Sequence, residues 1–223
     1  MFKDFDVAFQ PIYRTGSDDI FGFEVLLRSD IPPTELFSRA KTVNDFHLLD
    51  RQSRSLASQN FHLSNSTLFL NSHPLTVLYD EYFHQDIYDL LHNNNVVVEI
   101  TEQEIPDFGL LQYRIAQLRE MGAHVALDDF GTGYTNFQTL RYIQPDFLKI
   151  DRSYIESLTT DLTSKQVTDF ILRYATDLEC QIVVEGIEDF DQLNYVSGNN
   201  VGYAQGYLLG VPVLSGEFRG TYC

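Results

Sequence analysis

The chain has 223 residues and a formal net charge of −17, from 15 Lys and Arg against 32 Asp and Glu, and 43% of its residues are hydrophobic. These values are typical of a folded globular protein and exclude a disordered or fibrous chain. The acidic balance argues against DNA or RNA polymers as partners, because binding them draws on clustered Lys and Arg.

Membrane and secretory signals are not found in the sequence. No apolar run approaches the roughly 18 residues of a membrane span, and the start MFKDFDVAFQ has neither the basic region nor the cleavage site of a signal peptide. Cys180 and Cys223 form no disulfide framework and no C-x-x-C metal motif. We therefore expect a cytoplasmic protein with no membrane partner.

Eight short runs, most of them rich in β-branched or aromatic residues, predict strands. They lie at 7–13, 21–28, 67–71, 96–102, 124–130, 147–151, 181–186 and 201–209. Between them, residues 81–91 and 110–121 carry apolar side chains at helical spacing. Alternating strands and helices favour a parallel sheet, and eight strands in this length favour a closed α/β barrel, a TIM-like (β/α)8 fold.

The connection between the first two predicted strands departs from a regular barrel. Only RTGSDDI separates Tyr13 from Phe21, whereas a parallel crossover needs about a dozen residues or more. We therefore predict a modified barrel whose first strand runs antiparallel to the second. No linker, low-complexity tract or internal repeat divides the chain, so residues 1–223 are expected to form a single domain.

Polar side chains end every predicted strand from the second to the eighth. They are Glu24, Asn71, Glu99, Asp128, Asp129, Lys149, Glu185 and Gln205. A single polar strand end is as often a helix cap or a solvated loop start as it is a functional residue. However, the carboxyl ends of barrel strands meet at one rim, where the chemistry of this fold gathers. Seven polar strand ends together therefore indicate a functional site.

Alternation along the strands predicts which of these side chains face inward. Asp128 shares a face with Ala126, and Glu99 shares a face with Val97. Glu102 lies three residues beyond Glu99, so it is expected to point the other way and to hold a neighbouring loop.

The crowded carboxylates indicate a metal site, because they raise one another's pKa unless a cation compensates. The chain has few basic residues, and oxygen ligands select Mg²⁺ or Mn²⁺ rather than structural zinc. The six histidines show no H-x-H or H-E-x-x-H spacing. Two ions that share a carboxylate would explain why Asp128 and Asp129 are adjacent, and would suit displacement at phosphorus.

The motifs around these residues resemble those of the EAL-domain cyclic di-GMP phosphodiesterases of bacteria. They are FQPI (9–12), EVLLR (24–28), FLNSHP (69–74), EITE (99–102), DDFGTGYT (128–135), LKID (148–151), EGIE (185–188) and QGY (205–207). The resemblance covers nearly the whole chain. It implies the modified barrel and the metal-dependent hydrolysis of cyclic di-GMP to linear pGpG.

The resemblance also implies which residues bind metal. Glu24, Asn71, Glu99 and Asp128 resemble the ligands of a first ion. Asp128 resembles a ligand that is shared with a second ion, which Asp129 also binds.

Three further residues at the strand ends resemble parts of the catalytic site. Lys149 is similar to a lysine that contacts the nucleophilic water, Glu185 to a glutamate beside the metals, and Gln205 to a residue that supports the water and metal site. The alternative for Lys149 is a structural ion pair with Asp151, which lies on the same face of the strand.

The remaining implied roles concern a loop, the nucleotide and a second subunit. Glu102 resembles the glutamate that steadies the DDFGTGY loop, and Gln10 and Arg28 resemble residues that contact the nucleotide. A homodimer beside the loop after the fifth strand is also implied.

Three functions stay open at this point. An active phosphodiesterase is favoured because all the acids are present; the departures, such as Val25 and Val184, replace no ligand. The second function is a catalytically silent module that binds cyclic di-GMP or a protein partner. The third is a structural barrel or an enzyme for another phosphodiester. Metal-dependent release of pGpG separates the first function from the other two.

Overall fold

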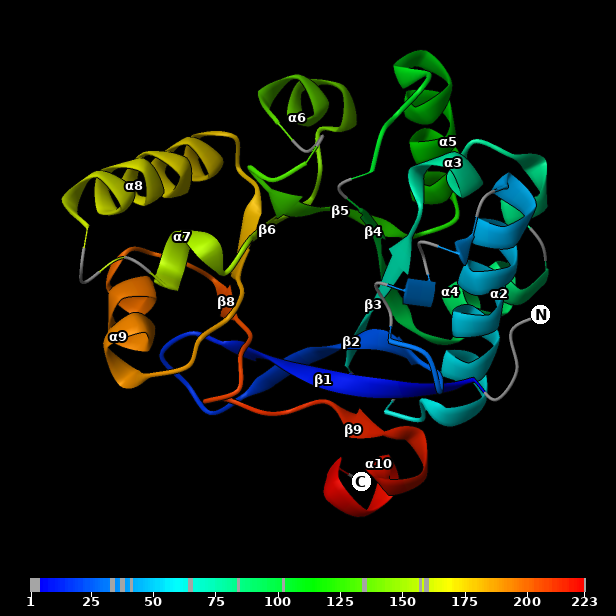
Figure 1. Cartoon of the computed structure of the whole chain (residues 1–223), viewed down its shortest axis with the longest axis horizontal. Helices are drawn as coiled ribbons and strands as arrows, with labels where there is room; N and C mark the ends of the chain where they lie inside the picture. The colour runs from blue at the N-terminus through cyan, green and yellow to red at the C-terminus, as the bar shows by residue number, and fades with distance from the viewer. Residues whose placement is uncertain are drawn as a thin grey trace.

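The computed structural model describes residues 5–32, 35–36, 39–40, 42–63, 66–83, 85–101, 103–133, 136–156, 158 and 161–222. Within these residues, eight strands close into a barrel and helices surround it (Figure 1). The strands are β1 (Asp6–Arg14), β2 (Ile20–Arg28), β3 (Thr67–Ser72), β4 (Asn95–Ile100), β5 (His124–Phe130), β6 (Phe147–Ile150), β7 (Gln181–Val184), β8 (Tyr203–Ala204) and, outside the ring, β9 (Val213–Leu214).

The sheet is mixed because of its first strand. Strands β2 to β8 lie in chain order, and each is parallel to the next. Strand β1 closes the ring, and it runs antiparallel to both β2 and β8. The predicted barrel with an antiparallel first strand is confirmed, and the tight turn between β1 and β2 is its cause.

Helices cover the outside of the barrel, and polar residues begin several of them. They are α2 (Val43–Asn60), α3 (Pro74–Val77), α4 (Gln85–Asn93), α5 (Phe108–Glu120), α6 (Phe137–Ile143), α7 (Ser153–Glu156), α8 (Leu162–Asp177), α9 (Phe190–Gly198) and α10 (Ser215–Tyr222), with a 3₁₀ turn η1 (Asp80–Tyr82). Thr42 before α2 and Asp189 before α9 form capping boxes. These caps satisfy backbone N–H groups that have no partner within the helix.

Two predicted segments are wrong. The strand predicted over 201–209 is reduced to β8, because the chain turns at Gly206, whose carbonyl accepts hydrogen bonds from the N–H groups of Leu209 and Gly210. Gly206 also lies so close to the backbone of Ile187 that a Cβ would overlap it. Strand β9, which the pattern did not predict, pairs with another part of β1. The helix predicted over 81–91 is divided into η1 and α4, because Phe83 leaves the helical conformation with a ψ of 47°.

Apolar side chains fill one end of the barrel interior. They are Ile12, Phe69, Val97, Ala126, Phe147, Val183 and Tyr203. Phe21 stacks on Tyr203 with ring centroids 4.1 Å apart, and the Arg14 guanidinium lies 4.9 Å from the centroid of Phe21. This end is therefore closed by packed side chains, and the polar residues lie at the other end.

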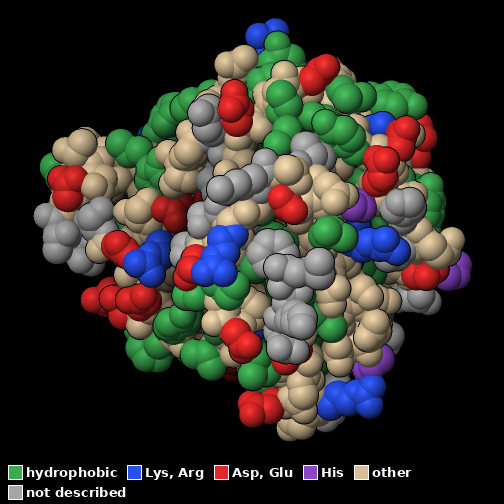
Figure 2. Space-filling model, turned by 45° about the vertical axis from the view of Figure 1, so that its right-hand side comes forward, with side chains coloured by type: hydrophobic (Ala, Val, Ile, Leu, Met, Phe, Trp, Pro, Cys, Tyr) green, Lys and Arg blue, Asp and Glu red, His purple; other side chains and the backbone are tan. Residues whose placement is uncertain are grey.

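The surface mixes charges of both signs. On the face that Figure 2 shows, Lys and Arg side chains are scattered among acidic and apolar ones. In the part of the chain that the structure describes, no helix has both the length and the apolar character needed to cross a bilayer.

Candidate metal and catalytic site

A polar layer lies directly above the apolar layer of the barrel interior. In six strands the polar residue follows an interior apolar residue by two positions, as alternation requires. The pairs are Phe69 and Asn71, Val97 and Glu99, Ala126 and Asp128, Phe147 and Lys149, Val183 and Glu185, and Tyr203 and Gln205. The shared faces predicted for Asp128 and Glu99 are confirmed, because both side chains contact Lys149.

A β-bulge holds the two adjacent aspartates. Leu127 pairs with Leu148 and Phe130 with Ile150, so two residues of β5 oppose one residue of β6. Asp129 has a φ of 48°, a left-handed conformation that aspartate adopts more readily than most residues. Neighbouring side chains on a regular strand point to opposite faces, whereas a bulge can turn the second one back. Asp128 and Asp129 can therefore serve the same site.

Lys149 lies at the centre of the polar layer. Its Nζ is 2.6 Å from Glu185 Oε1, 2.8 Å from Asp128 Oδ1 and 2.9 Å from Glu99 Oε1. A fourth carboxylate oxygen, Glu24 Oε2, lies at 3.7 Å. The Lys149 side chain is only 1% exposed, so four carboxylates, on β2, β4 and β5 and directly after β7, surround a buried ammonium.

Asp151 takes no part in this arrangement. Its Oδ1 accepts a hydrogen bond from the backbone N–H of Ser153, 3.0 Å away, at the start of α7. The structural alternative, in which Lys149 pairs with Asp151, is therefore not the arrangement in the structure.

Two amide side chains hold Glu24. Asn71 Nδ2 donates to Glu24 Oε1 at 2.9 Å, and Gln205 Nε2 donates to Glu24 Oε2 at 2.8 Å. These bonds fix both oxygens of the carboxylate. The Oε1 atom of Gln205 is buried and accepts no hydrogen bond from the described residues.

The electrostatics of the site follow from burial. Burial raises the pKa of Glu99 well above its ordinary value, and it also raises the pKa of Asp128; Lys149 opposes both shifts. Burial raises the pKa of Glu185 to about 8, again against the effect of Lys149. Burial alone would lower the pKa of Lys149, but the four carboxylates raise it well above its ordinary value. Lys149 is therefore charged, and one ammonium is too little positive charge to keep all the surrounding carboxylates ionised, so Glu99, Asp128 and Glu185 hold protons more tightly than usual.

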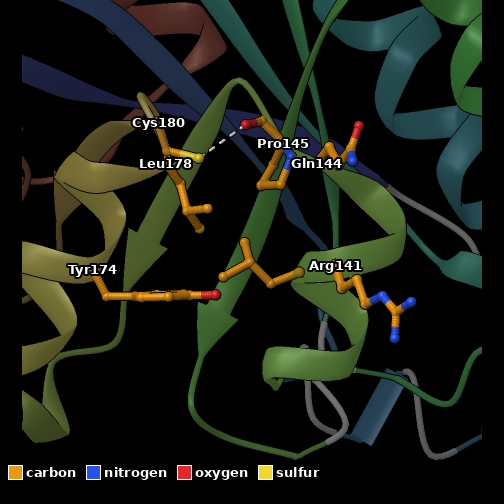
Figure 3. A pocket seen from close by; sticks show the side chains of 7 residues that line it. Arg141, Gln144, Pro145, Tyr174, Leu178 and Cys180 are labelled. Atoms are coloured by element: carbon orange, nitrogen blue, oxygen red, sulfur yellow. Dashed lines mark hydrogen bonds between the residues drawn. The ribbon is translucent and has the colours of Figure 1, made fainter.

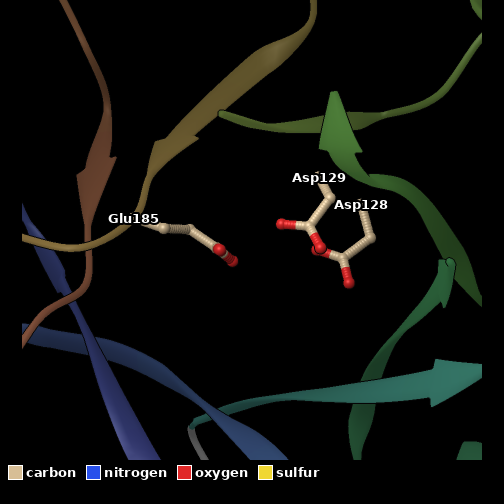
Figure 4. Close-up of side chains that lie close together, drawn as sticks. All are labelled: Asp128, Asp129 and Glu185. Carbon is tan, nitrogen blue, oxygen red and sulfur yellow. The ribbon is translucent and has the colours of Figure 1, made fainter. Parts of the chain in front are cut away.

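The residues present fit a divalent cation. Asp128 and Asp129 project from β5 and Glu185 from the end of β7 toward a common space (Figure 4), and each offers an oxygen within 4.8 Å of the others. Glu99 is fully buried, and its Oε2 accepts no hydrogen bond from the described part of the chain. We call Glu24, Glu99, Asp128, Asp129, Lys149 and Glu185 the rim cluster. Its oxygen atoms and excess negative charge are what a hard cation requires.

The other predicted site residues are placed less centrally. Gln10 pairs with Glu24 across β1 and β2, and its Nε2 donates to the carbonyl of Gly210 at 3.2 Å. Arg28 ends β2, and its guanidinium donates to the carbonyl of Leu27 at 3.1 Å. Glu102 lies outside the described residues.

Sequence reasoning missed one contact of the loop after β5. The Tyr154 hydroxyl donates to the Gly131 carbonyl at 3.3 Å, and a Cβ at Gly131 would overlap this hydroxyl. Gly131 has a φ of 94°, which favours glycine. The contact joins α7 to the turn that follows Asp129. In the sequence, Gly131 was the one sign that another group approaches the backbone closely at this position.

A pocket of about 390 Å³ lies apart from the rim cluster, between α6 and α8 (Figure 3). It includes Pro145 and Cys180, which precede β6 and β7, so it lies at the opposite ends of these strands. Cys180 Sγ donates to the Pro145 carbonyl at 3.1 Å, and burial raises the pKa of this thiol. The pocket therefore presents a thiol with a raised pKa, apolar side chains and the polar side chains of Arg141, Gln144 and Tyr174 rather than carboxylates.

A model of the family described as EAL domain matches residues 2–212. Because this match spans nearly the whole chain, the chain belongs to the EAL domain family. The resemblance carried by the sequence motifs is confirmed.

Curated relatives share most of this chain. The probable cyclic di-GMP phosphodiesterase PdeN of Escherichia coli (strain K12) is 31% identical over 233 residues, which cover 97% of this chain and 45% of PdeN. The cyclic di-GMP phosphodiesterase PdeL of the same organism is 27% identical, over 96% of this chain and 64% of PdeL. The chain thus spans about half the length of the curated relatives that it matches.

A solved structure has the same fold. The manganese and cyclic di-GMP complex of BlrP1 from Klebsiella pneumoniae at pH 9.0 is 27% identical to this chain, with a TM-score of 0.80. The match covers 96% of this chain and 57% of BlrP1.

The raised pKa of Glu185 predicts how the stability of the cation-free protein depends on pH. Between its ordinary value of 4.5 and about 8, the folded chain holds a proton at Glu185 that the unfolded chain has lost. The free energy of unfolding should therefore fall as pH rises through this window, by on the order of 2 kcal/mol between pH 6.5 and 8.5. Thermal denaturation of chelator-treated protein at the two pH values measures this difference.

Glu185→Gln is the control for this prediction, because it removes the titrating proton. This variant should show a flatter pH dependence than the wild-type protein. A cation-free wild-type protein that is more stable at pH 8.5 than at pH 6.5 would contradict the raised pKa.

Proposed function

We propose that this chain hydrolyses a phosphodiester bond of cyclic di-GMP and releases linear pGpG. The observation that carries the proposal is the rim cluster, where four carboxylates lie within 2.6–3.7 Å of Lys149 Nζ. PdeN and PdeL are named for this activity, and BlrP1 binds the same nucleotide in its complex. A buried ammonium among metal-binding oxygens suits a reaction in which negative charge grows on a phosphate.

The proposal includes two Mg²⁺ or Mn²⁺ ions. Glu24, Asn71, Glu99 and Asp128 would hold the first ion, and Asp128 with Asp129 would hold the second. When bound, such ions polarise the phosphate oxygens and make the attacking water more acidic. The all-oxygen donor set supports Mg²⁺ or Mn²⁺ over softer metals.

The side chains of the chain itself bind and orient the reactants. Once Glu99 and Asp128 are neutralised by cations, an N–H of Lys149 would be freed to donate a hydrogen bond to the attacking water and to stabilise charge on the phosphate. Glu185 Oε1, 2.6 Å away, would hold the ammonium in place. Gln205 keeps Glu24 in position. Arg28 and Gln10 contact the nucleotide, and Arg28 offsets phosphate charge.

The proposal extends to the organisation of the protein. Residues 1–223 would form a single catalytic domain, which the one continuous sheet of the described residues supports. We also propose that the protein acts in the cytoplasm and that two copies associate as a homodimer. Neither feature is needed for the reaction at the rim cluster.

Incubation with cyclic di-GMP tests the proposed reaction. We expect release of pGpG with Mg²⁺ or Mn²⁺, no turnover in excess chelator, and inhibition by Ca²⁺, which prefers a larger and looser shell of ligands. Chromatography of the nucleotides measures this release. Full activity in chelator would refute the cation mechanism, and binding of cyclic di-GMP without turnover would identify a silent module.

A further inference from the structure

Two ionisable residues of α2 are buried outside the rim cluster. Asp50 is 5% exposed and Arg54 is fully buried. Taking a charged pair out of water costs free energy, and apolar residues of similar size often stabilise a fold as well or better. The contacts of Asp50 and Arg54 therefore indicate what these two residues contribute to the fold or to the site.

Asp50 holds the turn that follows β3. Its Oδ2 accepts a hydrogen bond from the backbone N–H of His73 at 3.1 Å and another from the Thr76 hydroxyl. The same hydroxyl lies 2.8 Å from the carbonyl oxygen of His73. The His73 ring also stacks on Phe46 of α2, with ring centroids 3.9 Å apart. His73 is thus fixed to α2 through both its backbone and its ring.

Arg54 is linked through an aromatic ring to Ser72, the residue before His73. Its guanidinium lies 4.4 Å from the centroid of the Tyr82 ring. The Tyr82 hydroxyl is hydrogen-bonded to the Ser72 hydroxyl at 2.7 Å, and both groups are buried. Ser72 is therefore held on the outer side of the barrel.

Ser72 and His73 directly follow Asn71, whose side chain donates to Glu24 at 2.9 Å. In the sheet, Asn71 pairs with Glu99. The backbone at Asn71 is thus fixed by the sheet up to Ser72 and by α2 and η1 just beyond it. A shift of this turn would move Asn71 relative to both carboxylates.

From these contacts we infer that Asp50 and Tyr82 are positioning residues, which hold the turn after β3 so that Asn71 stays beside Glu24 as a cation ligand. The inference rests on the proposed function, because that function makes Asn71 a ligand. Residues that orient metal ligands typically change metal affinity about 10–100-fold when they are replaced.

Mn²⁺ binding to the full chain, followed by electron paramagnetic resonance after chelator treatment, tests the inference. Asp50→Ala removes the acceptor of the His73 N–H and should raise the Kd of the tighter Mn²⁺ ion at least about tenfold. Asp50→Asn keeps an acceptor oxygen but loses the charge, so it should restore most of the affinity. Leu172→Ala in α8 is the stability control; it should lower the thermal midpoint and leave the Kd unchanged.

A folded Asp50→Ala protein with the wild-type Kd would overturn the inference, because Asp50 and Arg54 would then serve stability alone. If Asp50→Ala does not fold, Tyr82→Phe replaces it, since it removes one hydroxyl and no charge. A wild-type Kd in Tyr82→Phe would then overturn the inference, and a raised Kd would support it. A wild-type chain that binds no Mn²⁺ would instead refute the proposed function, and the inference with it, before any variant is compared.

Discussion

Asp128→Asn is expected to lower the turnover of cyclic di-GMP by roughly 10³-fold, the scale seen when one charge-stabilising group is lost from a preorganised site. Asparagine keeps the shape of the side chain but not its charge. Asp128 is the residue proposed to bind both ions, and its Oδ1 also lies 2.8 Å from Lys149 Nζ. One substitution therefore weakens both cation sites and one of the contacts that hold the Lys149 ammonium in place. Release of pGpG at saturating Mn²⁺ measures the loss.

The same substitution should stabilise the cation-free protein. Asp128 is buried with Glu24 and Glu99 around one ammonium, so one negative charge fewer reduces their mutual repulsion. A higher thermal midpoint together with lost activity is expected when a group serves function but lowers the stability of the fold. A global folding defect would lower both.

Asp146→Asn is the matched control for Asp128→Asn. Asp146 lies before β6, accepts a hydrogen bond from the Val125 N–H at 2.9 Å and pairs with Arg119 at 3.3 Å, away from the rim cluster. It should cost some stability and leave turnover unchanged. Near wild-type turnover in Asp128→Asn would show that the shared-carboxylate assignment is wrong.

The barrel could be predicted from the sequence because its signals are local. Runs rich in β-branched or aromatic residues and bounded by turn residues mark seven of the eight barrel strands, and the short turn before Phe21 requires the antiparallel pairing of β1 and β2. The polar strand ends could be predicted to meet because parallel strands of a closed barrel end at one rim. Lys149 and Glu99 lie 2.9 Å apart as a result.

Other features depend on contacts between distant segments. The bulge at Asp129 arises from the register of β5 against β6, which the hydrophobic pattern does not encode. The sequence of α2 gives Asp50 and Arg54 no feature that separates them from surface charges, yet both are buried against the turn after β3. Strand β8 ends early where the chain turns at Gly206 and lies against the backbone of Ile187, in the loop after β7.

Lys149→Met should lower kcat by orders of magnitude while cyclic di-GMP still binds. Methionine fills a similar volume but supplies neither the charge nor the hydrogen bonds of the ammonium. The cation ligands and Arg28 remain, so most ground-state contacts with the nucleotide persist. An interaction made mainly in the transition state lowers kcat and kcat/KM together, whereas lost ground-state binding raises KM alone. Steady-state kinetics at saturating Mn²⁺ separates the two cases.

Stability supplies a second readout for Lys149→Met, because it removes the ammonium from the middle of four buried carboxylates. Leaving buried charges without their partner typically costs about 3–5 kcal/mol. The cation-free variant should therefore unfold at a lower temperature, and Mn²⁺ should restore much of the loss by neutralising the same oxygens. Lys165→Met, which removes a half-exposed lysine paired with Asp169, is the control and should change neither kcat nor the effect of Mn²⁺. If Lys149→Met keeps its kcat and only its KM rises, Lys149 is a binding residue, and the proposed mechanism loses the group that orients the water.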